Sequence, residues 1–337
     1  MRSVMIRGWK PRRKRRRNIG LIPAAAMLSL LAVLVCLPAS RDDGALARMV
    51  LAKSEPFFFP AQIMPGLPED PVQRLTVDMQ RLKQGRMLLV DEAHPIPEGV
   101  DAPNTVNILG YTHGRVACRD QQAQLGKEAL IALEELCVDA RNQGIGHITV
   151  TAGTRSQEQQ RNLLNEKAVQ LSRGMPLEEA VIQAKKYVQP PGCAEHQLPW
   201  TVDIRICRGW DKLPEEAALS ESEEGRWLTE HAWMYGFVQR WKGADPLQDD
   251  HRPYCFRYVG AVHAQLMHEL NIDYEEYLTL LHTCGALTLY NENGAPVLSA
   301  VCAEAGERHT VFEIPENVKI DDASLDNTGY ALLAFSY

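Results

Sequence analysis

The stretch AEHQLPWTVDI, residues 194–204, contains the two residues that most constrain the fold. His196 stands in a loop-like segment, and Asp203 follows seven residues later in the alternating run TVDIRI (201–206), which predicts a strand. A loop histidine and a strand carboxylate at this spacing can face one cleft. Both groups are good Zn²⁺ ligands, so the pair predicts a zinc centre that takes a third ligand from elsewhere and keeps an open position for water.

Two further segments carry candidate site residues near predicted strands. AGTRSQEQQ (152–160) runs from a strand into a helix and contains Arg155. RPYCFRYVG (252–260) leads into a strand and contains Cys255. An arginine fork pairs with a carboxylate in bidentate fashion, and a cysteine thiolate is a zinc ligand. Each segment alone is a weak signal, because a surface ion pair at Arg155 or a structural role for His196 is an ordinary alternative.

The chain from about residue 87 to residue 282 resembles the VanY-type D-alanyl-D-alanine carboxypeptidases, which are zinc peptidases that trim peptidoglycan stem peptides. The family's segments SGYRS…Q, SEHQTGLAVDI, WLAENAHKYGFILRY and EPWHFRYVG have counterparts, in the same order, in AGTRSQEQQ, AEHQLPWTVDI, WLTEHAWMYGFVQRW (227–241) and RPYCFRYVG. MLLVDEAHPIPEGV (87–100) resembles the family's lead-in strand. Five ordered segments rarely agree by chance, so the resemblance implies the family's fold and a peptidoglycan stem peptide as partner.

Matched position by position, the resemblance implies roles for individual residues. His196 and Asp203 correspond to the family's first two zinc ligands, and Cys255 replaces its third, a histidine. Arg155 corresponds to the arginine that holds the terminal carboxylate of the substrate, and Gln160 to a residue that assists it by hydrogen bonding. Zinc is therefore the implied cofactor.

The position of the family's general base, a glutamate, is Arg252 here. Arginine stays protonated in proteins and cannot take a proton from metal-bound water. Loss of a general base typically lowers the rate ~10²–10⁴-fold. The metal-site loop also differs, with Ala194 in place of serine and Leu198-Pro199 in place of Thr-Gly. No residue is therefore assigned as catalytic.

Other assignments of the chemistry stay open at this point. A displaced base is available in Glu195, Asp249, Asp250 or His251. Cys255 beside a histidine has the residue types of thiol catalysis. A disulfide between Cys193 and Cys255 would exclude zinc binding through Cys255.

Two classes of function fit these residues. The first is a membrane-anchored, zinc-dependent D-alanyl-D-alanine carboxypeptidase with a displaced base. The second is a pseudoenzyme, a catalytically inactive module that binds or senses peptidoglycan peptides through Arg155. A structural ectodomain without a ligand is a third, plainer reading. Zinc content separates the first two, because only the enzyme requires the metal.

The remaining periodicity predicts an α+β fold, with helices packed around a small antiparallel sheet that carries a zinc-peptidase-type cleft. Helices are expected at 125–145, 156–174, 176–188, 223–235, 261–272 and 274–282. Strands are expected at 147–153, 201–206, 255–260, 309–314 and 329–337, with a short strand after Gly236 and a hairpin at 286–301 around the turn NENG.

Domain organisation follows from composition along the chain. We expect a basic cytoplasmic tail (1–18), a transmembrane signal anchor (19–38), a proline-rich stalk (39–84), the carboxypeptidase-like domain (85–283) and a small C-terminal β subdomain (284–337). The uncharged run Ile19–Leu37 is long enough to cross a bilayer core of roughly 30 Å. The positive-inside rule then places the C-terminal body outside the cell. Cleavage of the segment, which would give a secreted protein, is the alternative.

Charge bears on the partner of the body, and the cysteines bear on its disulfides. Residues 1–17 hold nine of the 36 Lys and Arg side chains and no acid, so the remainder carries a net charge of −16, which argues against a nucleic-acid partner. Seven cysteines lie beyond the apolar segment, in a compartment where disulfides persist. The pairs that are local in sequence are Cys118–Cys137, Cys193–Cys207 and Cys284–Cys302, and the alternative is that some or all of these residues are buried thiols.

Overall fold

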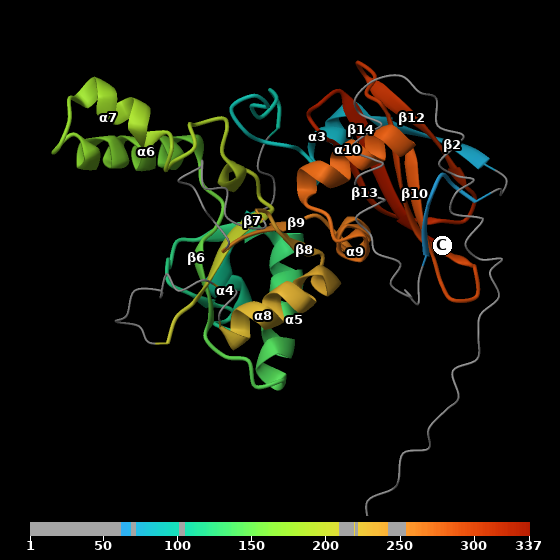
Figure 1. Ribbon diagram of the computed structural model, residues 1–337, viewed down its shortest axis with the longest axis horizontal. Coiled ribbons are helices and arrows are strands. Elements are labelled where there is room, and N and C mark those ends of the chain that lie inside the picture. Colours follow the sequence, from blue (N-terminus) through green and yellow to red (C-terminus); the bar gives the residue numbers. More distant parts are fainter. Residues whose placement is uncertain (1–61, 69–71, 101–104, 209–218, 220–221, 242–253) are drawn as a thin grey trace, which may run out of the picture. The chain divides into compact units, whose positions relative to one another are not determined.

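The computed structural model describes residues 62–68, 72–100, 105–208, 219, 222–241 and 254–337, which all belong to one unit, 45–337 (Figure 1). The predicted tail (1–18) and signal anchor (19–38) lie outside the described residues. Among the residues that are described, no helix is long and apolar enough to span a membrane.

The chain forms a mixed helix and sheet fold. The longer helices are α5 (Lys127–Asn142), α6 (Gln157–Leu171), α7 (Leu177–Ala184), α8 (Glu223–His231), α9 (Ala261–Leu270) and α10 (Tyr274–Cys284). Short helices are α3 (Met79–Lys83), α4 (Ile108–Thr112), and the 3₁₀ turns η2 (Glu195–Gln197) and η4 (Ala232–Tyr235). These positions confirm the helices that the sequence predicts.

The sheet that carries the candidate site has five strands in the order β4-β6-β7-β9-β8. Its strands are β4 (Ala117–Cys118), β6 (Ile148–Ala152), β7 (Thr201–Ile206), β8 (Phe237–Gln239) and β9 (Cys255–Tyr258). All of its pairings are antiparallel except the short parallel pair β4–β6. The prediction of a small, mainly antiparallel sheet is therefore confirmed.

One apolar core joins this sheet to α5 and α8. Helix α5 contributes Leu130, Leu133, Leu136 and Ala140, all fully buried and spaced to face one side of the helix. The same core contains the buried apolar residues of β6 and β7, together with Trp227 and Leu228 of α8. This packing fixes the strands whose ends carry the candidate site.

The helix that follows β6 begins with a complete capping box. The Ser156 hydroxyl accepts from the Gln159 backbone N–H, and the Gln159 side chain accepts from the Ser156 N–H. Arg155 therefore lies between the end of β6 and the first turn of α6. Helices α6 and α7 pack against each other beyond this point (Figure 1).

A second sheet has the order β1-β10-β11-β14-β13, and β12 pairs with β2 in a two-stranded ladder. These strands are β1 (Gln62–Pro65), β2 (Val72–Asp78), β10 (Ala286–Tyr290), β11 (Pro296–Glu304), β12 (His309–Pro315), β13 (Lys319–Leu325) and β14 (Tyr330–Ser336). A third, two-stranded ladder joins β3 (Thr105–Asn107) to β5 (Gln124–Gly126). The predicted hairpin and C-terminal strands are all present.

The described part of the predicted stalk forms regular structure. Gln62–Pro65 and Val72–Asp78 form β1 and β2, which pair with β10 and β12 near the other end of the chain. The expectation of a stalk is therefore wrong for these residues. Helices α9 and α10 also share one apolar core with β10, β11 and β14, so the packing is continuous across residue 284.

The apolar run Met87–Val90 is buried but forms no strand, contrary to the expected lead-in strand. Its backbone groups find partners outside any ladder. The Met87 N–H donates to Ser324 Oγ at 2.9 Å and the Leu89 N–H to Asp326 O at 2.9 Å. The carbonyl of Leu88 instead accepts from the guanidinium of Arg257 at 3.3 Å.

Candidate metal and peptide-binding site

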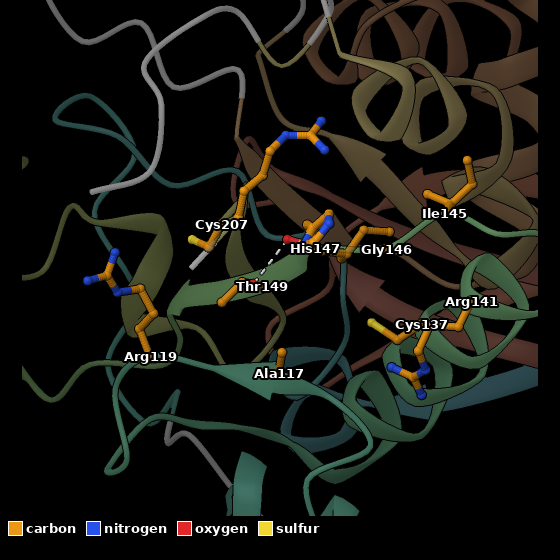
Figure 2. A pocket seen from close by; sticks show the side chains of 11 residues that line it. Ala117, Arg119, Cys137, Arg141, Ile145, Gly146, His147, Thr149 and Cys207 are labelled. Carbon is orange, nitrogen blue, oxygen red and sulfur yellow. Dashed lines mark hydrogen bonds between the residues drawn. The ribbon is translucent and has the colours of Figure 1, made fainter. Parts of the chain in front are cut away.

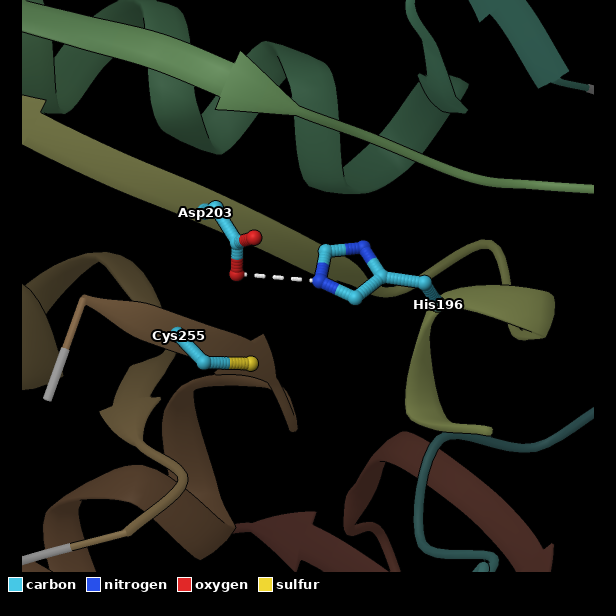
Figure 3. Close-up of side chains that lie close together, drawn as sticks. All are labelled: His196, Asp203 and Cys255. Atoms are coloured by element: carbon cyan, nitrogen blue, oxygen red, sulfur yellow. Dashed lines mark hydrogen bonds and ion pairs between the residues drawn. The ribbon is translucent and has the colours of Figure 1, made fainter. Parts of the chain in front are cut away.

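Three predicted ligands converge at the ends of the central strands (Figure 3). His196 lies on η2, Asp203 on β7 and Cys255 at the start of β9. Their candidate ligand atoms all lie within 4.8 Å of one another, and all three residues are buried. His196 Nε2 and Asp203 Oδ1 are 2.9 Å apart. The structure thus brings together residues that are 59 positions apart in the sequence.

The pairing of β7 with β9 places two of these groups side by side. Asp203 and Cys255 are direct partners in the antiparallel register. Directly opposed residues of neighbouring strands project from the same face of a sheet. A one-residue slip would send one of the two groups to the opposite face. The strand register therefore determines this half of the site.

The orientation of His196 suits a metal ligand. Its Nδ1 lies 2.8 Å from the carbonyl oxygen of Gly153, which can only accept a hydrogen bond. Nδ1 therefore carries a proton, and in the neutral ring Nε2 presents its lone pair towards Asp203. Two acceptors 2.9 Å apart require a shared cation, either a proton or a metal ion. A histidine that donates its second N–H to a backbone carbonyl is the usual arrangement around zinc.

The donor set matches zinc chemistry. Imidazole nitrogen, carboxylate oxygen and thiolate sulfur are all common Zn²⁺ ligands. Burial of the three residues would make an uncompensated carboxylate and thiolate costly, so a bound divalent cation fits this environment. The residues present therefore fit the metal that the resemblance implies.

Gly153 is required by a close backbone contact. A Cβ at this position would lie 2.2 Å from the carbonyl oxygen of Gln124. The next N–H, of Thr154, donates to the same oxygen at 2.7 Å. Only glycine lets these two segments approach so closely, and this approach presents the Gly153 carbonyl to His196.

Arg155 and Gln160 lie together at the start of α6. The Arg155 N–H donates to His196 O at 2.6 Å, so the arginine is tied directly to the metal-ligand loop. Its Nη1 donates to Gln160 Oε1 at 3.4 Å. Gln160 is fully buried, and its Nε2 donates to Gln189 O at 2.7 Å. In this structure Gln160 therefore orients Arg155 and does not itself face solvent.

Glu195 does not serve as the displaced base. It is fully buried, accepts from Arg240 Nε at 2.7 Å, and is also bonded to Arg257 Nη1 and Thr201 Oγ1. Desolvation raises the pKa of this carboxyl, but attraction to Arg257 and then Arg240 outweighs it and holds the pKa below its ordinary value. A general base needs a pKa near the working pH, so this assignment is wrong.

The other residues considered as bases, Asp249, Asp250 and His251, lie outside the described residues, as does Arg252.

The seven described cysteines form no disulfide. Cys118 and Cys137 belong to the same apolar core, where burial raises the pKa of their thiols to about 11 and about 12. The three local pairs expected from the sequence are thus thiols here. Cys255 and Cys193 are likewise not joined, which leaves the Cys255 sulfur beside Asp203 and His196.

A separate cavity of about 370 Å³ lies at the opposite ends of β6 and β7 (Figure 2). Arg119, Arg141, His147 and Cys207 are among its lining residues. Figure 2 shows Arg119 and Arg141 on opposite sides of the cavity. None of the predicted site residues lines it.

Two arginines that surround Glu195 were not among the residues predicted from the sequence. Arg257 is the charged residue inside the buried run CFRYVG, and Arg240 directly follows the strand FVQ. A charged side chain in a run that is otherwise apolar is a usable signal, because Arg is almost never fully buried unless it is paired.

The comparisons with known proteins agree with this geometry. Residues 122–261 match the family model described as VanY: D-alanyl-D-alanine carboxypeptidase. A D-alanyl-D-alanine carboxypeptidase of Enterococcus faecium is 24% identical over 213 residues, which are 62% of this chain and 62% of that protein. One of Enterococcus faecalis is 30% identical over 149 residues, 43% of this chain and 52% of that protein. The chain thus spans between one half and two thirds of these relatives.

Among solved structures, the vancomycin-resistance D,D-dipeptidase VanXYg, in complex with a D-Ala-D-Ala phosphinate analog, has a TM-score of 0.58. It is 19% identical and covers 79% of this chain and 100% of its own, which is a likeness of fold alone. The fold is thus the mixed helix and sheet fold of this class of peptidases. Residues 122–261 match the VanY-type family model, and this match supports the resemblance found in the sequence.

Proposed function

We propose that this protein recognises the D-alanyl-D-alanine end of peptidoglycan stem peptides at a zinc-bearing site and hydrolyses them poorly or not at all. The observation that carries the proposal is the convergence of His196, Asp203 and Cys255. The position of the family's general base is Arg252. The relatives that match the chain are named as D-alanyl-D-alanine carboxypeptidases, which supports the class of ligand.

Arg155 supplies the recognition of the peptide terminus. Its guanidinium is held by Gln160, and its backbone is bonded to the His196 carbonyl. A planar fork in a fixed position suits the carboxylate that ends a stem peptide. Recognition therefore needs the free carboxylate and does not require cleavage.

When bound, zinc would supply a Lewis acid that polarises a peptide carbonyl. His196, Asp203 and Cys255 would hold it, with the Gly153 carbonyl fixing the imidazole. A thiolate donates more charge than an imidazole, so the Cys255 ligand makes the metal a weaker electrophile than a histidine would. This ligand favours binding over hydrolysis.

The weak point for catalysis is proton transfer, because the position of the family's general base does not hold a proton acceptor here. Arg252 replaces the family's glutamate, and the buried Glu195 is engaged by two arginines. Residual hydrolysis is the second candidate function, and the retention of three converging ligands is the observation that favours it.

Calorimetry with zinc-loaded protein and a synthetic stem pentapeptide ending in D-Ala-D-Ala tests the proposal. The same peptide with a C-terminal amide is the control for carboxylate recognition. Binding that the amide weakens, together with little release of D-alanine, supports the proposal. Fast release of D-alanine establishes the second candidate function, and the absence of binding to either peptide overturns both.

We also propose that residues 19–38 anchor the protein in the cell membrane, with residues 1–18 inside and the body outside. The support is the basic run followed by an uncharged apolar segment. Membrane fractionation and protease accessibility of intact cells test this topology. A full-length chain found only in the medium or the soluble lysate contradicts it.

A further inference from the structure

A fully buried ion cluster lies beside the three candidate ligands. Its members are Glu195, Arg240, Arg257 and Thr201. Glu195 Oε1 accepts from Arg240 Nε at 2.7 Å, and its Oε2 accepts from Arg257 Nη1 and from Thr201 Oγ1, the latter at 3.2 Å. The side chains of Glu195 and Arg257 are 0% exposed, so the cluster cannot serve as a solvated surface pair.

The cluster occupies the next rung on the same face of the ladder that carries the site. Thr201 is the direct partner of Arg257, just as Asp203 is the direct partner of Cys255. Residues two apart in a strand share a face, so both rungs project from one side of the sheet. The ion cluster and the candidate ligands are therefore neighbours on one surface.

The remaining contacts join this rung to three other segments. Arg257 Nη2 donates to Arg86 O at 2.6 Å, which holds the segment before Met87. Arg240 lies directly after β8, its N–H donates to Cys255 O at 2.9 Å, and its guanidinium reaches Glu275 of α10 at 2.8 Å. Glu195 is thus the one carboxylate that both arginines share in the described part of the chain.

We propose that Glu195 is a positioning residue of the metal site, which it serves by fixing His196 relative to Asp203 and Cys255. Glu195 precedes His196 directly, and Arg257 follows Cys255 by two residues. The ion pair therefore ties the loop that bears one ligand to the strand that bears another. This inference rests on the proposed zinc site.

The double substitution Glu195→Met with Arg257→Met is the sharpest probe. It removes one anion and one cation together, and Arg240 keeps its partner Glu275. Replacement of a buried ion pair by apolar side chains of similar size is often tolerated, whereas removal of one partner leaves a buried charge uncompensated. The double variant therefore isolates positioning from a general loss of folding.

The experiment is a zinc competition titration against a chromophoric chelator, with the far-UV circular dichroism of each metal-free protein and the thiolate-to-cobalt absorption of the Co²⁺ form. We expect zinc affinity to fall at least about 10-fold in the double variant, as for other groups that orient metal ligands. The cobalt band should also shift or weaken, while the circular dichroism is unchanged. The matched control is Glu224→Gln, which breaks the Arg208–Glu224 pair (2.9 Å) away from the site and should leave zinc affinity unchanged.

The outcomes separate the two proposals. Zinc binding by the wild type with unchanged affinity and spectrum in the double variant overturns the role of Glu195 and leaves the proposed function intact. A wild-type protein that binds no zinc overturns the proposed site, and the inference with it. If the double variant does not fold, Thr201→Val, which removes a single hydrogen bond to Glu195, should still weaken zinc binding about 3-fold. An unchanged affinity there contradicts the inference.

Discussion

Asp203 and Cys255 are direct partners across the β7–β9 ladder, and their side chains lie on the face of the sheet that His196 approaches from η2. The register of two strands thus supplies two ligands, and a separate loop supplies the third. Substitutions can therefore test the ligands and their surroundings one at a time.

Cys255→Ser should remove stoichiometric zinc. A serine hydroxyl is not a zinc ligand at neutral pH, and loss of a direct ligand should exceed the ~10–100-fold cost of losing an outer partner. Elemental analysis of the dialysed protein measures the change. Cys193→Ser, at a half-buried cysteine outside the ligand set, is the control and should keep its zinc. Equal zinc in both variants would show that the sulfur of Cys255 is not a ligand.

Arg252→Glu combined with Cys255→His should create hydrolysis. The pair restores a proton acceptor and a neutral third ligand, and a general base contributes ~10²–10⁴-fold in rate. Release of D-alanine from a D-Ala-D-Ala peptide should rise at least about 100-fold over the wild type. The single variants Arg252→Glu and Cys255→His are the controls. A double variant that binds zinc but cleaves no faster would contradict our explanation of the missing activity.

Arg155→Met should weaken binding of the stem peptide. A hydrogen bond to a charged group contributes about 1.5–3 kcal/mol, so the dissociation constant should rise roughly 10–100-fold. The amide-terminated peptide should bind both proteins equally. Arg161→Met, on the exposed side of the same helix, is the matched control and should change neither affinity.

Gly153→Ala should damage the fold and the site together. Its Cβ would meet the Gln124 carbonyl oxygen at 2.2 Å, and overpacking of this kind costs about 1–3 kcal/mol of unfolding free energy. Displacement of the Gly153 carbonyl should also lower zinc affinity. Gly146→Ala is the control, since a Cβ there meets nothing within 4 Å. Chemical denaturation and zinc titration together measure both effects.

His263 should make the protein sensitive to mild acid. The residue is fully buried against Tyr277, and desolvation, with a smaller contribution from Arg86, lowers its pKa to about 3 from an ordinary value of 6.5. The pKa of His263 is lower in the folded than in the unfolded protein. Its contribution to the free energy of unfolding is therefore fully present above pH 6.5 and is lost as the pH falls towards 3.

Between pH 7 and pH 5 this group alone should lower the free energy of unfolding by about 2 kcal/mol. Urea denaturation across this range measures the slope. His263→Gln does not titrate and can still accept from the Tyr277 hydroxyl. Between pH 7 and pH 5 its free energy of unfolding should therefore fall by about 2 kcal/mol less than that of the wild type. Identical slopes would contradict the assignment.

Much of the fold could be predicted because its signals are local. The apolar spacing of α5, the capping box at Ser156 and the alternation in TVDIRI each depend on neighbouring residues only. β1 and β2 were missed because their ladder partners lie more than 200 positions away, and five prolines between residues 54 and 71 resemble a linker. The run Met87–Val90 looks like a strand locally, but Arg257 and Ser324 take its backbone groups.

In the candidate site, too, some features could be predicted from the sequence and others could not. The resemblance groups His196, Asp203 and Cys255, and the strand register brings them together. Their function as metal ligands stays a prediction. The engagement of Glu195 by two arginines could not be predicted, because a sequence gives no distance between a loop carboxylate and residues 45 and 62 positions further on.

The pairing of β1 with β10 and of β2 with β12 also bears on the order in which the chain can fold. Gln62 is opposite Tyr290, and Asp78 is opposite His309, so these ladders close loops of more than 200 residues. Contacts of such high sequence separation form slowly. Because synthesis proceeds from the N-terminus, β1 and β2 are made early. Their ladder partners are made only with the last third of the chain. These early strands should therefore be the part of the described chain most dependent on a chaperone.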